Sequence, residues 1–574
     1  MHLYLDSPQT IDCEALLPDT RTLLANAELR FYADNASDLY DLTWPWADAI
    51  YAASIRLRVT SLIGDELTPI SNRYFASHQE TILGNESIIV SKRLMAPFKS
   101  SEDRSVIWNL ECQAEGDHVL RLEVEIDWGE PLTQRIVDGL LVAQHNPQAP
   151  RGLYEQSNAE STRVFGNPQA RPDLYEIDDP QRARLVYHVL VNGEVQVPLL
   201  LTLSDVGEQM AWSTFLGLRE SDETFDKSVH NWEETLRVGR LWTPDASLNQ
   251  AVQLGRILAL HNLQQFRSGY AAYDQSASNT ARLIAALDTF EPTLSRNLLA
   301  TFRRLAEQTS GRMPLTFPSH PKSPQSDPGT LFLHGVYTYF QSLAGHLSHQ
   351  FDAELLTRHF AAIQLCSEAL IRHRWEQNGT LPLEELQTCE AALRLALRFA
   401  TIHQDEVSIV RWEGEVTEFQ RLIAQAGGKS SAAQRPSSMP VDWIGWSTQV
   451  GWTESADRPW RFADFWRGID LAAKAVWQGV GLDLGGANYT VQPTFPEQWS
   501  WWALLDLPTN AGKLRAVWDG NVLHSTLPIQ STYPVQVHSR IRALGFEELS
   551  WDPRFEFVDE AEAITRFYPK FDLC

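Results

Sequence analysis

The strongest constraint on the fold of this 574-residue chain is a change of hydrophobic periodicity along its length. Over residues 1–240, apolar side chains alternate with polar ones or run together with β-branched residues, which is typical of strands. Apolar residues recur at helical spacing from about 246 to 426, and the strand pattern returns after 488. The sequence therefore predicts a multidomain β + α protein: an N-terminal β-sandwich, a central (α/α) array of helical hairpins and a small C-terminal β-sheet.

Local signals place the boundaries between these parts. Thr243-Pro244-Asp245 indicates a helix start, because proline is tolerated in the first turn and an acid is favoured there. The small-residue stretch 424–440 has the composition of a linker. We therefore expect domains at 1–240, 241–482 and 483–574. The expected helices lie near 246–266, 278–288, 294–309, 330–347, 352–374, 384–402, 406–426 and 463–480.

One tight turn is expected inside the first domain. Asn192-Gly193 separates the apolar runs LVYHVLV and EVQVPLLLTL, and both residues tolerate positive φ. This pattern predicts a two-residue β-hairpin.

The net charge excludes several classes of partner. The chain has 48 basic and 73 acidic side chains and a net charge of −25, so neither nucleic acid nor an anionic membrane surface is an expected partner. No apolar run approaches the roughly 20 residues of a membrane span, and the N-terminus does not have the pattern of a signal peptide. We therefore expect a cytoplasmic protein.

The cysteines are consistent with a reducing compartment. There are five, widely scattered, with neither a disulfide framework nor a zinc motif. They are Cys13, Cys112, Cys366, Cys389 and Cys574. The sequence offers no phosphate-binding or dinucleotide-binding loop either, so no cofactor is expected. His346 and His349 stand three apart on one helix face and could share a metal ion, but no third ligand is evident, so no metal site is expected.

Tryptophan is abundant, with 20 residues in the chain. Its flat ring packs in cores, and it also provides stacking surfaces for sugar rings. The densest segment is 441–468, where Glu454 and Asp457 are interleaved with tryptophans. This composition is typical of a sugar groove, and it also suits a buried aromatic wall with exposed acids.

Several segments together carry a family resemblance. Residues 268–287 combine Gly-Tyr, a loop and an apolar helix, GRMPLTFPS follows at 311–319, and SDPGTLFLHGVYTYF at 326–340. With 383–397 and 463–499, these segments resemble in order and spacing the amylo-α-1,6-glucosidase domain of glycogen debranching enzymes, within the six-hairpin glycosidase superfamily. The resemblance implies a β-sandwich followed by an (α/α) toroid. The toroid would be abbreviated here, because about eight helices are expected where a full barrel needs twelve.

The resemblance also implies a substrate and a mechanism. We expect an oligosaccharide or glucan whose α-glucosidic linkage is cleaved with inversion, which needs two carboxylates about 6.5–9.5 Å apart. Glu384, which aligns with a glutamate of the family, and Glu454 are the expected catalytic pair. The expected substrate-binding residues are Tyr270, Asp274, Asp327, Trp446, Trp452 and Trp460.

Structural roles would explain some of these residues equally well. Asp274 and Asp327 precede expected helices and could cap them, and Glu384 lies where a helix dipole favours an acid.

The chain also departs from the family pattern. Asn279 stands where the family has an acid, and there is no room after NGTLP (378–382) for the Trp-Met-Asp segment that supplies the family's general acid. Two hypotheses follow. The chain is a glycoside hydrolase, or it is a hydrolase-derived protein that binds a glycan or a protein partner without turnover.

Overall fold

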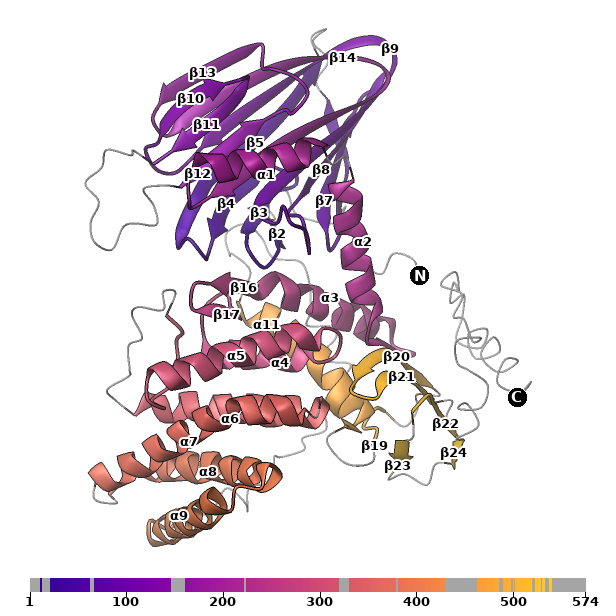
Figure 1. The fold of residues 1–574 in the computed structure, drawn as a ribbon. Helices are drawn as coiled ribbons and strands as arrows, with labels where there is room; N and C mark the ends of the chain where they lie inside the picture. Colours follow the sequence, from indigo (N-terminus) through magenta and orange to yellow (C-terminus); the bar gives the residue numbers. More distant parts are fainter. Residues whose placement is uncertain are drawn as a thin grey trace.

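The computed structural model describes most of the chain. The described residues are 11–12, 21–61, 67–145, 161–220, 223–318, 330–350, 352–377, 380–428, 462–484, 489–496, 499, 501–518, 522–527, 529–531 and 536–538. Their arrangement is a large β-sheet, a stack of helices and a smaller group of strands at the end of the chain (Figure 1). The β + α class predicted from periodicity is confirmed.

The N-terminal part is one 14-stranded sheet among the described residues. Its strands are β1 (Ile11–Asp12), β2 (Thr22–Ala25), β3 (Arg30–Ala33), β4 (Leu39–Trp44), β5 (Ala49–Ser61), β6 (Thr68–Tyr74), β7 (His78–Gly84), β8 (Ile88–Met95), β9 (Ser105–Asp127), β10 (Thr133–Val137), β11 (Leu140–Gln144), β12 (Thr162–Gly166), β13 (Leu174–Asp179) and β14 (Arg182–Ser204).

Two long strands organise this sheet. β9 and β14 pair antiparallel along almost their whole lengths. On its other side, β9 pairs first with β8 and then with β5, so the sheet divides into two arms. Side chains from both arms enter one hydrophobic core. The buried ammonium of Lys92 on β8 donates to the carbonyl of Leu57 on β5 at 2.9 Å, which joins the arms. A regular β-sandwich remains the prediction for this part.

The predicted hairpin at Asn192-Gly193 is wrong. β14 runs straight through these residues as one strand, with a shift of register between Val191 and Gly193. Gly193 adopts φ 74°, which is the conformation that the turn prediction required. Residues 115–117 of β9 lie opposite Asn192 alone, so the extra residues of this irregularity belong to β9. A left-handed glycine is compatible with such an irregular position as well as with a tight turn, so the local pattern does not distinguish them.

The helical part begins with two connecting helices and continues as a stack. Its elements are α1 (Glu208–Glu220), α2 (Thr224–Arg237), α3 (Ala246–Asn262), α4 (Ala277–Leu287), α5 (Pro292–Gln308), α6 (Leu331–His349), α7 (Ala353–Glu376), α8 (Leu383–His403), α9 (Glu406–Gln425), α11 (Phe462–Lys474) and the π-helical turn η2 (Ala475–Val480). Every helix expected from 246 onward is present. Asp245 caps α3 by accepting a hydrogen bond from the Leu248 N–H at 3.0 Å, as the start signal predicted.

The first of these helices is shorter than expected. α3 ends at Asn262, and residues expected to continue it form β16 (Leu263–Phe266), which pairs with β17 (Gly269–Ala272). The backbone N–H of Gln265 donates to the carbonyl of Ala27 in the first domain at 2.8 Å. Pairing across the domain boundary therefore overrides the local helical preference.

The helices stack as hairpins. α4 packs on α6 and α6 on α8, while α5 and α7 return between them and α9 packs on α8. The stack runs from α3, next to the large sheet, to α9 at the far end (Figure 1). α11 comes back to the beginning of the stack and packs on α3 and α4. A closed toroid remains a prediction, because residues 429–461 lie outside the described part of the chain.

Glycine permits the closest of these helix contacts. A Cβ atom on Gly255 of α3 would lie 2.0 Å from the carbonyl oxygen of Gly468 on α11. The two helix backbones can approach this closely because residue 255 has no side chain.

The end of the chain forms two small sheets in the described residues. One contains β15 (Arg240–Trp242), β20 (Trp502–Thr509), β21 (Gly512–Trp518), β22 (Val522–Ser525) and β24 (Gln536–His538). The other contains β18 (Leu482–Asp483), β19 (Tyr489–Val491) and β23 (Ile529–Ser531). β15, which lies between α2 and α3, thus pairs with β20, which follows the helical stack.

Buried polar contacts fix the large sheet to the helices. His261 of α3 is fully buried, and its ring nitrogens contact the Tyr74 hydroxyl and the Ala76 carbonyl, both at 3.1 Å. The side-chain amide of Gln264 donates to the carbonyl of Asn26 at 2.9 Å. The β2–β3 turn is therefore held against the first helical hairpin. None of the described helices has the length and apolarity to cross a membrane.

Candidate functional site

The predicted site residues that the structure describes lie on one side of the helical stack. α4, α6 and α8 are neighbours that alternate with returning helices, so their N-terminal ends face the same side (Figure 1). Tyr270 lies on β17, Asp274 in the turn before α4, and Glu384 in the first turn of α8. The remaining predicted residues lie outside the described part of the chain: Asp327, Trp446, Trp452, Glu454 and Trp460.

Asp274 orders the loop before α4, and the helix cap is a different residue. Ser276 caps α4 by accepting from the Asn279 N–H at 3.3 Å. The carboxylate of Asp274 accepts from the Ser276 N–H at 3.1 Å and from the side-chain amide of Asn279 at 2.6 Å. An acid at position 279 would repel Asp274. The side-chain amide of Asn279 is therefore matched to the carboxylate beside it.

Glu384 is exposed in the first turn of α8. A carboxylate at this position is favoured by the unpaired N–H groups of the helix end. Its neighbour Glu385 contacts His373 of α7 at 3.5 Å. The placement is compatible with both interpretations of Glu384, catalytic or helix-stabilising, and its catalytic role stays a prediction.

Two carboxyl groups that the sequence did not single out lie near Tyr270. Glu28 is in the β2–β3 turn, and Asp103 is in the loop before β9. Glu28 is buried, and its carboxylate accepts from the Trp44 indole N–H at 3.0 Å and lies 3.7 Å from the Arg104 guanidinium.

The environment raises the pKa of both carboxyl groups. Burial raises the pKa of Glu28, although the Trp44 and Arg104 contacts oppose it. Burial, together with the negative charge of Glu28, raises the pKa of Asp103 to about 6. The pKa of the Tyr270 hydroxyl is raised by burial and by both carboxylates. The three groups therefore share one electrostatic environment.

Asn26 sets the relative position of the two acids. Its side-chain amide donates to the carbonyls of Pro97 at 2.6 Å and Asp103 at 2.8 Å. Its side-chain oxygen accepts from the Glu28 N–H at 2.8 Å. One asparagine thus ties the turn that carries Glu28 to the loop that carries Asp103.

Two half-buried tyrosines, Tyr270 and Tyr273, lie on β17 and directly after it. The guanidinium of Arg30 sits 3.6 Å from the centre of the Tyr273 ring and donates to the Tyr32 hydroxyl at 3.1 Å. Tyr32 and Tyr270 both pack against the core of the helical stack. We refer to Glu28, Asp103, Tyr270 and Tyr273 as the interface site. It combines a carboxyl group of raised pKa with aromatic surface, which suits a sugar.

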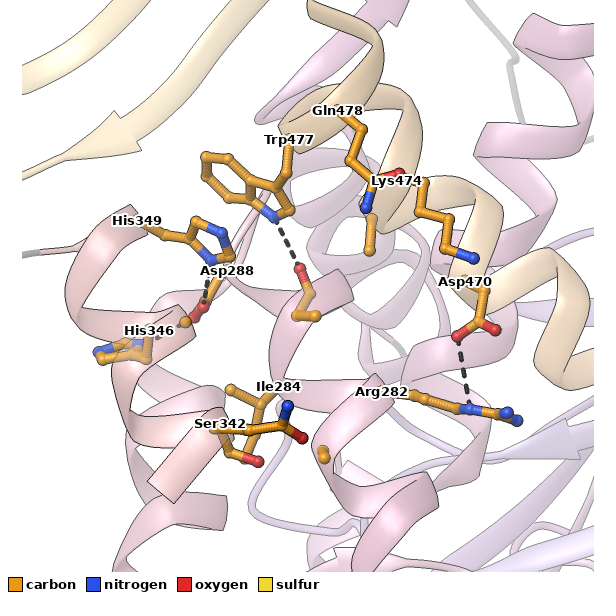
Figure 2. Close-up of a pocket in the computed structure, with 15 residues that line it drawn as sticks. Arg282, Ile284, Asp288, Ser342, His346, His349, Asp470, Lys474, Trp477 and Gln478 are labelled. Atoms are coloured by element: carbon orange, nitrogen blue, oxygen red, sulfur yellow. Dashed lines mark hydrogen bonds and ion pairs between the residues drawn. The ribbon is translucent and has the colours of Figure 1, made fainter. Parts of the chain in front are cut away.

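The histidine pair of α6 is held by a carboxylate. His346 and His349 both place Nδ1 against Asp288, at 2.7 and 3.0 Å (Figure 2). Asp288 lies directly after α4, 58 residues before His346. Among the residues that the structure describes, no group of three or more His, Cys, Asp or Glu side chains could hold a metal ion.

Comparison with known proteins gives distant structural similarity only. No protein-family model matches this chain, and no curated protein matches it. A proposed kojibiose phosphorylase from the human microbiome superposes with a TM-score of 0.49 at 11% identity, over 92% of this chain and 90% of its own. The GH92 α-mannosidase BT3965 from Bacteroides thetaiotaomicron gives 0.47 at 9% identity, over 89% and 88% of the two chains. The GH78 rhamnosidase of Bacillus sp. GL1 gives 0.42 at 10% identity, over 78% and 55%.

Proposed function

We propose that this chain is a carbohydrate-active protein that takes an oligosaccharide or glucan at the interface site, with Asp103 as the proton donor. The observation that carries the proposal is the Asp103 carboxyl group, whose pKa is raised to about 6 beside Glu28 and the half-buried Tyr270. The ordered resemblance of residues 268–499 to the debranching glucosidase domain supports the choice of an α-glucosidic linkage.

The chemistry would follow the inverting scheme. The Asp103 carboxyl group gives its proton to the glycosidic oxygen as the bond to the anomeric carbon breaks. A second, ionised carboxylate takes a proton from the water that attacks the opposite face of the sugar. Asp103 would thus replace the acid of the absent Trp-Met-Asp segment. Glu384 and Glu454 keep their predicted role as candidates for the second carboxylate.

The other residues of the interface site would keep this acid functional. The negative charge of Glu28 favours the protonated form of Asp103, as a like charge does in other acid pairs. The rings of Tyr270 and Tyr273 would stack on the sugar. The proposal needs no metal or cofactor, and a cytoplasmic location remains part of it.

The test is sugar release together with sugar binding. Purified protein is incubated with α-glucans and α-linked disaccharides, products are separated by chromatography, and binding of the same sugars is measured by calorimetry. The expected result is release that Asp103→Asn reduces by at least 100-fold with binding retained, because general acid catalysis contributes about 10²–10⁴-fold. Asp226→Asn, an exposed acid on α2, is the matched control and should behave like the wild type.

A second function is favoured by the pairing of Asp274 with Asn279. Both oxygens of Asp274 are engaged by the loop, as in a protein that keeps the site without using it for chemistry. Binding of sugars with no release would establish this glycan-binding function. Absence of both binding and release would refute both proposals.

A further inference from the structure

A pocket of about 350 Å³ opens between α4, α6 and the α11–η2 segment (Figure 2). It reaches the C-terminal ends of α4 and α6, where Asp288, His346 and His349 are found. The 11 residues of α4 span about 16 Å between its two ends. The lining also includes Arg282 in the middle of α4, which donates a hydrogen bond to Asn279 at 3.3 Å. None of Glu28, Asp103, Tyr270 and Tyr273 lines the pocket, so the two sites are formed by different residues.

One wall of the pocket is rigidly held. Asp288 is fully buried, and its contact with His349 fixes that ring parallel to the Trp477 ring, with 3.7 Å between centroids and 5° between planes. The indole N–H of Trp477 donates to the carbonyl of Ala285 at 2.9 Å. The aromatic surface is therefore positioned before any ligand arrives, which lowers the entropic cost of binding.

The polar part of the lining is balanced in charge. Arg282 on α4 faces Asp470 on α11, with Nε and Oδ1 3.6 Å apart (Figure 2). Lys474 adds a second positive charge and Asp288 a second negative charge, so the two basic and two carboxylate side chains balance. A lining with no net charge gives an ionic ligand no advantage over a neutral one.

The remaining lining residues supply small apolar surface and amide groups. Ala281, Ala285, Gly345 and Ala473 leave room beside the indole. Amides, a hydroxyl and charged groups of both signs offer donors as well as acceptors. A sugar ring has matching properties, because it carries hydroxyl groups that donate and accept around an apolar face.

We propose that this pocket is a second binding site, and that its ligand is one unit of a neutral saccharide. Trp477 stacks on the ring, and Arg282 and Asp470 bind its hydroxyl groups. The proposal stands on the lining of this pocket and does not depend on catalysis at the interface site.

The test is calorimetric titration of the full chain with glucose, maltose and maltotriose, with glucose 6-phosphate as the anionic comparison. Trp477→Ala should weaken one class of sites roughly tenfold or more, since loss of an aromatic contact is of that order. Arg282→Ala, whose side chain is 44% exposed, is a second variant that leaves the packing of the stack intact. Trp375→Ala is the matched control, because Trp375 is 66% exposed on α7 and does not line the pocket.

The outcomes separate this proposal from the proposed function. Weakening by Trp477→Ala and Arg282→Ala, with Tyr270→Ala affecting a different class of sites, supports a second site. The proposal is overturned if both pocket variants, folded as judged by circular dichroism, bind sugars like the wild type. It is also overturned if glucose 6-phosphate binds more tightly than glucose, or if no neutral sugar binds.

Discussion

The substitution Asp103→Asn should change stability in a pH-dependent way. Asp103 has a pKa of about 6 in the folded chain against an ordinary value of 3.8, mainly because it is buried and also because Glu28 is near. The folded state therefore holds a proton between these two pH values that the unfolded state has lost. The contribution of protonated Asp103 to the stability of the folded state is fully present below pH 3.8 and is lost as pH rises through 6.

The size of the effect follows from the difference between the two pKa values. Each pKa unit corresponds to about 1.4 kcal/mol, which sets an upper limit of about 3 kcal/mol at neutral pH. Partial exposure of the side chain lowers this to about 1–2 kcal/mol. Asparagine cannot ionise, so the variant escapes the cost of a buried charge at high pH.

The assay is urea unfolding of the wild type and of Asp103→Asn at pH 4 and at pH 8. The free energy of unfolding of the variant, relative to the wild type, should rise by about 1–2 kcal/mol between the two pH values. Asp226→Asn should show no such change, because Asp226 is exposed. An equal difference between Asp103→Asn and the wild type at both pH values would refute the raised pKa and the role built on it.

Three further predictions concern the acid pair, the helix stack and the pocket. Glu28→Gln should move the basic limb of the pH–activity profile to lower pH, because removing the neighbouring charge lowers the pKa of Asp103. An unchanged basic limb would show that Glu28 does not influence the titration of Asp103. Gly255→Ala should destabilise the chain by about 1–3 kcal/mol in urea unfolding, since its Cβ would overlap the α11 backbone. Gly414→Ala on α9, where the new Cβ meets nothing within 4 Å, should raise the free energy of unfolding by about 0.5–1 kcal/mol. A similar loss of stability in both glycine variants would contradict the close packing of α3 on α11. Asp288→Asn should lower the free energy of unfolding by about 1.5–3 kcal/mol and weaken sugar binding in the pocket, because two imidazoles lose a charged hydrogen-bond acceptor. Thermal melting measures the loss of stability and calorimetric titration the loss of binding, and an unchanged value of either would contradict the prediction.

Sequence predicted the change from strands to helices and back because periodicity is a local property. It did not predict α1 and α2, which lie within the range 1–240 that was expected to form strands. The helix start at Asp245 and the helices that follow could be identified from neighbouring residues alone. Two other errors come from tertiary contacts. No hairpin forms at Gly193 because β14 continues along β9 with a shift of register. The helix expected to reach 266 ends at Asn262 because the next residues pair with β17 and contact the first domain.

Sequence could suggest candidate site residues only where they are close together in the chain. Tyr270 and Asp274 stand within a segment that resembles a family loop. Asp103 was missed because its neighbour Glu28 is 75 residues away, and only the fold brings the two together. Asp288 was missed for the same reason, since a pattern within one helix does not show a carboxylate delivered by another helix.

The most direct measurement for the proposed function is a crystal structure of the full chain with a maltooligosaccharide bound. The interface site predicts a sugar ring against Tyr270, with a glycosidic oxygen within hydrogen-bond reach of the Asp103 carboxyl group, about 2.6–3.2 Å. A sugar found only in the pocket lined by Trp477, or no sugar on either surface, would contradict the assignment of the interface site.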